Sequence, residues 1–335
     1  MKILIVRVSS LGDVVHNMPM VADILRRHPQ AQIDWVVEEA YTSLLRLNTG
    51  VHHVIPFALR RWRKSLLAAD TRAEIRRFRE RLREEAYDFV FDTQGLTKTG
   101  VVMRMARLAP GGRRIGLANG TEGSGYEGVS RIFHHRSVPV DSRTHAVLRG
   151  RLVAAAALGY RVDTPADFLL SPPAMPQPPA WLPEGRYAVF FHATARASKQ
   201  WAPEHWVETA GLLAERGLPV LLAWGSAAEK EAAQRLAAQM VNATVLPKLS
   251  MMEAVLLAQG AALAIGVDTG LTHIAAAYER PTIELYCDSP RWKTEGNWSS
   301  NIINLGDQGA PPSVADVATA ITSLLGAADA RRAPS

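Results

Sequence analysis

Short apolar runs recur along the sequence, and each is followed by a polar turn and then by a stretch with helical periodicity. The run at residues 3–8 is interrupted only by Arg7, which is typical of a central parallel strand buried on both faces. Because strands alternate with helices, the pattern predicts the α/β fold class with doubly wound parallel sheets. We expect strands at residues 3–8, 33–37, 51–57, 87–91, 113–117, 187–191, 218–224, 243–246, 261–265 and 282–286.

A proline-rich segment interrupts this alternation. Six prolines lie between residues 172 and 183, a density that cannot continue a helix or a central strand. The sequence therefore predicts two Rossmann-like domains that face a cleft, and the carboxyl ends of the strands are the expected ligand site. The expected divisions are an N-terminal domain at 1–170, a Pro-rich linker at 171–186, a C-terminal domain at 187–325 and a flexible tail at 326–335.

Composition restricts the class and the compartment. A single cysteine, Cys287, excludes an internal disulfide and a cysteine metal cage, which fits a reducing cytosol. We find no signal-peptide pattern and no apolar run near the roughly 20 residues of a membrane span. The net charge of +6 and the pI near 9.6 indicate an anionic partner, such as nucleic acid, a phosphorylated metabolite or an acidic membrane. The dinucleotide, P-loop and HExxH motifs are absent, which disfavours dehydrogenases, P-loop NTPases and zinc hydrolases.

Basic side chains gather in the segment RRWRK, around Trp62. No acidic residue is interleaved with them, whereas the arginines of the predicted helix at 71–86 alternate with glutamates and indicate a solvated face. We therefore expect RRWRK to bind phosphate or carboxylate groups. A glycine-rich and then polar stretch at 118–140 is expected to be a mobile loop near the site. The cations of RRWRK are Arg60, Arg61, Arg63 and Lys64.

The stretch GVDTGLTHIAA, at residues 266–276, follows a predicted strand and begins a helix. Asp268 and Thr269 are placed to cap that helix, and Gly270 lets a ligand approach the backbone. Free N–H groups and the helix dipole favour phosphate there, with His273 one turn further on. The alternative is a capped helix with a histidine whose hydrogen bonds are satisfied inside the protein.

Other polar residues follow predicted strands. Asp13 is placed to take a proton from an attacking hydroxyl, although Ser10 and Asp13 also fit a capping box. Thr194 and Lys199 can bind phosphate oxygens, although a loop lysine is more often simply solvated. Glu229 is either a ribose-binding carboxylate or a side chain on the helix surface.

These segments together resemble the bacterial lipopolysaccharide heptosyltransferases, glycosyltransferase family 9, which have the two-domain GT-B fold. The resemblance covers nearly the whole chain. VDTGLTH is typical of the family, and RRWRK with SSLGD favours the members that add the first heptose. The segments that carry it are KILIVRVSSLGDVVHNMP, IDWVVEE, VIPFALRRWRK, YDFVFDTQGLTK, YAVFFHATARASKQW, LPKLS and GVDTGLTHIAAA.

The resemblance implies transfer of L-glycero-D-manno-heptose from ADP-heptose to the Kdo residue nearest lipid A, with inversion by single displacement. Asp13 matches the family's proposed general base. The implied partners are ADP-heptose, Kdo2-lipid A and the anionic surface of the inner membrane, with no nucleic acid. The resemblance further implies a cytoplasmic protein, peripheral on the cytoplasmic face, that uses no metal and no cofactor. Closure of the two domains is expected to assemble the site.

The same resemblance implies roles for two groups of residues. Ala195 stands where the family often has a second threonine, and Leu249 stands where it has methionine, which leaves an apolar adenine contact. The positions that match donor-binding residues are Thr194, Ala195, Lys199, Glu229, Leu249, Asp268, Thr269, Gly270 and His273. The positions that match the acceptor-binding residues are Ser10, Arg60, Arg61, Arg63 and Lys64.

Three alternatives remain open at this point. A sister transferase would share the donor half and add a later heptose or modify a protein. A basic nucleic-acid-binding protein would use RRWRK and the arginine-rich helix, although no helix-turn-helix or RNA-binding signature is present. A nucleotide-sugar epimerase of the same fold would need no acceptor.

Overall fold

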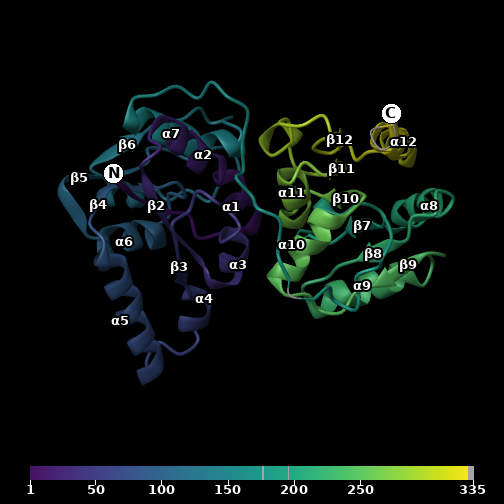
Figure 1. Cartoon of the computed structure of the whole chain (residues 1–335), viewed down its shortest axis with the longest axis horizontal. Helices are drawn as coiled ribbons and strands as arrows, with labels where there is room; N and C mark the ends of the chain where they lie inside the picture. The colour runs from purple at the N-terminus through teal and green to yellow at the C-terminus, as the bar shows by residue number, and fades with distance from the viewer. Residues whose placement is uncertain (176, 195, 331–335) are drawn as a thin grey trace. The chain divides into compact units, whose positions relative to one another are not determined.

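The structure is a computed structural model that describes residues 1–175, 177–194 and 196–330 (Figure 1). The chain divides into two compact units, Met1–Ser171 and Pro172–Ser335. Among the described residues from 172 to 187, none lies in a helix or strand, since the prolines there remove backbone donors and fix the backbone. Each unit is built around one six-stranded sheet, and the predicted α/β class with two doubly wound sheets is confirmed.

The N-terminal unit has a parallel sheet in the order β3-β2-β1-β4-β5-β6. β1 lies at its centre and is buried after its first residue, because helices cover both faces of the sheet. The strands are β1 (Lys2–Val6), β2 (Gln32–Glu38), β3 (His53–Phe57), β4 (Tyr87–Asp92), β5 (Leu108–Leu117) and β6 (Arg136–Val138). The helices are α1 (Leu11–Asn17), α2 (Pro19–Arg27), α3 (Thr42–Leu45), α4 (Leu59–Trp62), α5 (Ala69–Glu84), α6 (Thr97–Met105) and α7 (Ala146–Leu158), with short 3₁₀ turns η1 (Glu39–Tyr41) and η2 (Gly128–Phe133).

The segment at 118–140, expected to be a mobile loop, is more regular than its composition indicates. It contains η2 and the edge strand β6, which pairs in parallel with β5. The Tyr126 hydroxyl donates to the Ala118 carbonyl at 2.8 Å, and α6 packs on η2. Residues 118–127 are therefore irregular, as expected, whereas η2 and β6 give the rest of the segment regular structure.

The C-terminal unit repeats the same design with the order β12-β11-β10-β7-β8-β9, again parallel throughout. The strands are β7 (Ala188–Phe191), β8 (Val220–Leu222), β9 (Ala243–Val245), β10 (Leu263–Val267), β11 (Thr282–Tyr286) and β12 (Ile302–Gly306). The helices are α8 (Pro203–Ala214), α9 (Ala227–Ala237), α10 (Met251–Gly260), α11 (Gly270–Ala277) and α12 (Val314–Ala330), with η3 (Ala197–Lys199) and η4 (Arg291–Lys293).

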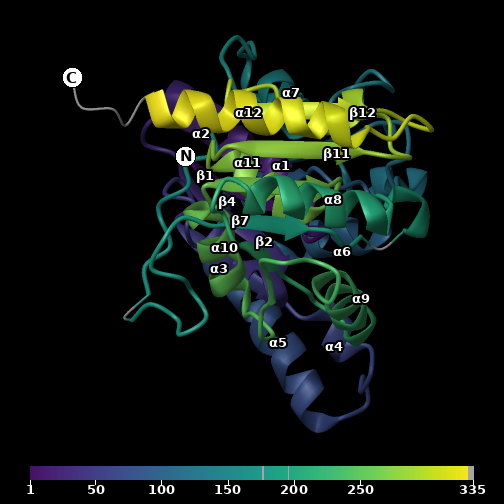
Figure 2. The same cartoon turned by 90° about the vertical axis from the view of Figure 1, so that its right-hand side faces the viewer.

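The last strand and helix were not expected from the sequence. β12 is a partly exposed edge strand, so its apolar run is weak. α12 crosses its own sheet beside α8, β10, β11 and β12 (Figure 2), and it buries Val317, Ile321 and Leu324 in the core of this unit. The helix continues to Ala330, inside the stretch assigned to a tail, and residues 331–335 lie outside the described residues.

Candidate functional site

Several of the polar residues singled out in the sequence follow strands at which the strand order reverses. In the N-terminal unit the reversal lies between β1 and β4, and Asp13 comes from α1, directly after β1. In the C-terminal unit it lies between β7 and β10. Thr194 and Lys199 follow β7, and residues 268–273 follow β10. Such switch points are where open α/β sheets bind ligands.

In the C-terminal unit, Asp268 joins two cations. Its Oδ2 accepts a hydrogen bond from Lys199 Nζ at 2.5 Å, and its Oδ1 lies 3.1 Å from His273 Nε2. The Thr294 hydroxyl donates to the same Oδ1 at 3.2 Å. Burial favours the protonated acid, but the bonds from His273 and Lys199 outweigh it and hold the pKa of Asp268 well below its usual range. Asp268 is therefore a buried anion that positions a lysine and a histidine.

His273 is bound on its other side by Glu284 of β11. The distance from His273 Nδ1 to Glu284 Oε1 is 3.0 Å, and Glu284 Oε2 accepts bonds from the Tyr286 hydroxyl at 2.9 Å and the Gly296 N–H at 2.8 Å. Burial opposes the imidazolium, but Glu284 and Asp268 outweigh it and raise the pKa of His273 to about 10. His273 is thus both satisfied within the protein and positively charged at neutral pH.

The prediction that the side chains of Asp268 and Thr269 cap α11 is wrong. Thr269 occupies the N-cap position with extended backbone, but neither it nor Asp268 makes the capping bond from its side chain. Ion pairs with Lys199 and His273 take the Asp268 carboxylate, since a bond to a cation is stronger than one to a neutral amide. The first N–H groups of α11 therefore have no side-chain cap, which is the arrangement that binds anions.

A glycine permits the close packing of β10 on α11. A Cβ atom at Gly266 would lie 2.1 Å from Thr272 Oγ1 and 2.8 Å from Phe191 Cβ. The Thr272 hydroxyl donates to the Val267 carbonyl at 2.8 Å. These contacts hold the end of β10 against the start of α11 and fix the position of the turn between them.

The remaining donor-side residues lie on neighbouring loops of this unit. Thr194 is half-buried after β7, and Leu249 is half-buried just before α10. Glu229 completes the capping box of α9, because its Oε2 accepts the Gly225 N–H at 2.6 Å and the Ser226 N–H at 3.1 Å. In the structure, Glu229 Oε2 therefore caps the start of α9. Ala195, also proposed for the donor, lies outside the described residues.

In the N-terminal unit, the Asp13 carboxylate makes the capping-box bonds and two ion pairs besides, and its role as a general base stays a prediction. Its Oδ2 accepts the Ser10 N–H at 3.1 Å and the Ser10 hydroxyl at 3.0 Å, as in a capping box. Its Oδ1 pairs with Arg7 Nη2 at 2.6 Å and Arg149 Nη2 at 3.2 Å. Burial acts to raise the pKa of Asp13, but the two buried arginines outweigh it and hold that pKa far below the usual range.

The side chains of the segment RRWRK differ in their charge partners and in their exposure, although the sequence indicated a uniformly uncompensated basic segment. Arg61 is compensated after all, since its guanidinium bonds Glu39 and Glu74, which lie far from it in sequence. Trp62 is buried against Phe57 and Phe78 and serves the core of this unit. Arg60, Arg63 and Lys64 are exposed.

Several groups at these strand ends were missed from the sequence. Arg7 could have been identified from the sequence, because it is the one charged residue inside an apolar run. Arg149 could not, because it comes from a distant helix. Lys98, on α6, places its Nζ 3.4 Å from Ser9 Oγ and adds a cation beside β1. Glu284, Tyr286 and Thr294 sit in or near an apolar strand and gave no motif.

Within the described residues, no helix is long and apolar enough to cross a bilayer. Each unit contains a Rossmann-type sheet. In the C-terminal unit cations flank the start of a helix at the strand ends, and in the N-terminal unit a carboxylate lies at the strand ends. These features define a two-domain glycosyltransferase of the GT-B fold. The model of glycosyltransferase family 9 (heptosyltransferase) matches residues 75–319, and the chain belongs to this family. The resemblance stated from the sequence is confirmed.

Relatives agree with this assignment. The chain is 39% identical over 288 residues to lipopolysaccharide heptosyltransferase 1 of Escherichia coli K12, covering 85% of this chain and 88% of that one. It is 40% identical over 287 residues to lipopolysaccharide heptosyltransferase 1 of Pseudomonas aeruginosa PAO1, covering 85% and 78%. The solved structure of E. coli heptosyltransferase WaaC with ADP is 35% identical, has a TM-score of 0.80 and covers 98% of this chain and 99% of that one. WaaC with ADP-2-deoxy-2-fluoro heptose has a TM-score of 0.75 with the same identity and coverage.

Proposed function

We propose that this enzyme transfers L-glycero-D-manno-heptose from ADP-heptose to the inner Kdo of Kdo2-lipid A, the reaction of a heptosyltransferase I. The observation that carries the proposal is the partly buried network of Lys199, Asp268 and His273 beside the start of α11, which has no side-chain cap. A partly exposed lysine next to backbone N–H groups that have no side-chain cap suits a diphosphate. The relatives named heptosyltransferase 1, and the solved relative with an ADP-heptose analogue, support this donor.

On the donor side, the diphosphate binds at the start of α11, where Thr269 and Gly270 supply backbone N–H groups and Lys199 supplies charge. Thr194 adds a hydroxyl after β7. Leu249 offers an apolar surface to the adenine, and Glu229 Oε1 faces the ribose while its Oε2 keeps the helix cap.

The chemistry is a single displacement. The acceptor hydroxyl oxygen forms a bond to the anomeric carbon as the bond from that carbon to the phosphate oxygen breaks, and ADP leaves with the bonding pair. The leaving diphosphate gains negative charge, which Lys199, the imidazolium of His273 and the α11 dipole stabilise. Because protein cations supply this charge, we propose that the reaction needs no metal and no cofactor.

Asp13 accepts the proton of the attacking hydroxyl. A carboxylate with so low a pKa is a weak base toward a free alcohol. The hydroxyl becomes strongly acidic once its oxygen bonds the anomeric carbon, so transfer to Asp13 late in the displacement is favourable. Arg7 and Arg149 keep the carboxylate ionised and oriented until that moment.

The acceptor is anionic and membrane-anchored, and the segment from α4 to α5 suits it. Arg60, Arg63 and Lys64 are exposed there, and the apolar side chains of Leu66 and Leu67 are 51% and 88% exposed. Cations with protruding leucines are suited to an anionic lipid surface. We propose that the protein is cytoplasmic and binds peripherally to the cytoplasmic face of the inner membrane, with Ser10 and these cations meeting the Kdo carboxylates and lipid A phosphates.

Two acceptors test the assignment. The purified protein is given ADP-heptose with either de-acylated Kdo2-lipid A or the same acceptor already carrying its first heptose. We expect transfer to the first and none to the second. Transfer only to the heptose-bearing acceptor, or to a protein, would replace the proposal by that of a sister transferase, and equal activity with and without EDTA is expected throughout.

A further inference from the structure

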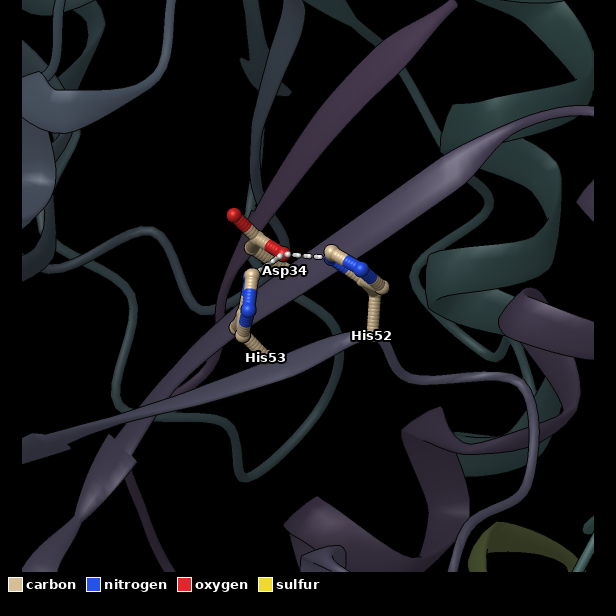
Figure 3. Close-up of side chains that lie close together, drawn as sticks. All are labelled: Asp34, His52 and His53. Atoms are coloured by element: carbon tan, nitrogen blue, oxygen red, sulfur yellow. Dashed lines mark ion pairs between the residues drawn. The ribbon is translucent and has the colours of Figure 1, made fainter.

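A side-chain cluster lies at the amino ends of the N-terminal strands, the edge of this sheet opposite to Asp13. Asp34 of β2 is paired in register with His53, the first residue of β3, and His52 immediately precedes that strand (Figure 3). Asp34 Oδ1 lies 3.2 Å from His53 Nδ1 and 3.5 Å from His52 Nδ1. One ligand-type atom from each of the three residues lies within 4.8 Å of the other two.

The carboxylate of this cluster is buried and its two imidazoles are partly exposed, an arrangement that a ligand can reach from solvent. Asp34 is 4% exposed, and its Oδ1 is shielded from solvent and accepts no hydrogen bond within the described part of the chain. The side chains of His52 and His53 are 47% and 39% exposed, so the cluster opens to solvent. A buried carboxylate oxygen that faces two imidazole nitrogens is costly unless a cation or proton joins them.

We propose that Asp34, His52 and His53 bind a borderline divalent transition metal of the Zn²⁺ class. A tetrahedral ion with bonds of 2.0–2.1 Å to its ligands separates neighbouring ligand atoms by about 3.3 Å. The two distances from Asp34 Oδ1 match that separation without rearrangement. Imidazole and carboxylate are the donors that this class of metal prefers, and solvent completes the coordination on the exposed side.

An outer hydrogen bond supports the carboxylate. Tyr87, buried at the start of β4, donates its hydroxyl to Asp34 Oδ2 at 2.8 Å, which leaves Oδ1 for the metal. Such outer bonds orient metal-binding carboxylates.

The site joins β2 to β3 and lies at the strand ends away from the proposed chemistry, so its role is structural. No sequence motif indicates this site, because Asp34 lies far from the two histidines in sequence and falls within an apolar strand. The competing explanation is an ordinary cluster in which protonated histidines pair with the carboxylate.

Metal titration separates these explanations. Untagged full-length protein, freed of metal by a chelator, is titrated with Zn²⁺ against a chromophoric chelator, and Co²⁺ absorption reports coordination geometry. We expect one site per chain, with Asp34→Asn and His53→Gln weakening it at least tenfold. Tyr87→Phe, which keeps the ring, should weaken it about 10- to 100-fold. His28→Gln, which changes a histidine elsewhere in the unit, should leave it unchanged.

The unfolding temperature provides a second readout. Zn²⁺ should raise it in the wild type and in His28→Gln, and should not raise it in Asp34→Asn. Circular dichroism of each metal-free variant checks that it folds. The proposal is overturned if folded Asp34→Asn binds Zn²⁺ as tightly as the wild type, or if the wild type shows no saturable site.

Discussion

At the scale of single residues, Asp13 combines a helix cap with ion pairs to two buried arginines. Asp13→Asn keeps an oxygen that can accept the Ser10 N–H, so the cap survives while the charge is lost. We expect transfer to slow roughly a hundredfold or more and the free energy of unfolding to fall by about 1–3 kcal/mol, since Arg7 and Arg149 lose their partner. Steady-state rates and denaturant unfolding measure the two effects separately. A folded variant that keeps near-wild-type turnover would leave Asp13 as a cap alone.

Lys199 stabilises the leaving group in this account. Lys199→Gln should lower kcat/KM about 10²- to 10³-fold, because one charged donor to the diphosphate is lost. Arg235→Gln removes an exposed cation from α9 in the same unit and serves as the matched control. Equal losses in the two variants would show a general charge effect and contradict a specific role for Lys199.

The charge of His273 makes stability depend on pH in a defined direction. Because folding raises the pKa of His273 from 6.5 to about 10, its stabilisation is complete below pH 6.5 and is lost as the pH rises to about 10. The free energy of unfolding of the C-terminal unit should fall across this window by up to about 1.4 kcal/mol per pH unit.

Denaturant unfolding at several pH values measures this slope. His273→Gln should flatten it, whereas His205→Gln in the same unit should keep it. The same slope in wild type and His273→Gln would show that another group titrates.

These residues also show how far sequence patterns reach. Asp13, Lys199, Asp268 and His273 were identifiable because each follows an apolar run that predicts a strand. Their partners Arg149 and Glu284 were not identifiable, since they become neighbours only through the order of strands and helices in the folded sheet.

At the scale of elements, the segment between α4 and α5 has a testable surface role. Leu67→Ser should weaken binding to vesicles containing anionic lipid about tenfold, because a leucine that enters the bilayer contributes about 1.5–3 kcal/mol. Val241→Ser changes an apolar side chain that is 95% exposed in the other unit and is the matched control. Vesicle co-sedimentation measures both. If both variants bind as the wild type does, this segment does not dock on the membrane.

The predictability of the elements follows their burial. Central strands such as β1 and β10 were predictable from continuous apolar runs, because both faces are covered. The edge strands β6 and β12 were not, since a partly exposed strand needs few apolar residues. RRWRK was only partly predictable, because Trp62 packs on α5 and Arg61 pairs with Glu74 from that helix.

At the scale of the whole molecule, the chain repeats one strand order in two units and gives each a different chemical role. In the proposed mechanism, the C-terminal unit presents cations and a helix start to the donor, and the N-terminal unit presents the carboxylate and the exposed basic segment to the acceptor. Both are needed in this mechanism, because the displacement requires a stabilised leaving group together with a group that accepts the proton of the attacking hydroxyl.

The most direct measurement follows ADP release and product mass together, with purified protein, ADP-heptose and de-acylated Kdo2-lipid A. The account predicts that one heptose is added to the acceptor for each ADP released, and that ADP release nearly stops when the acceptor is omitted. ADP release that does not depend on the acceptor, or an acceptor of unchanged mass, would contradict it.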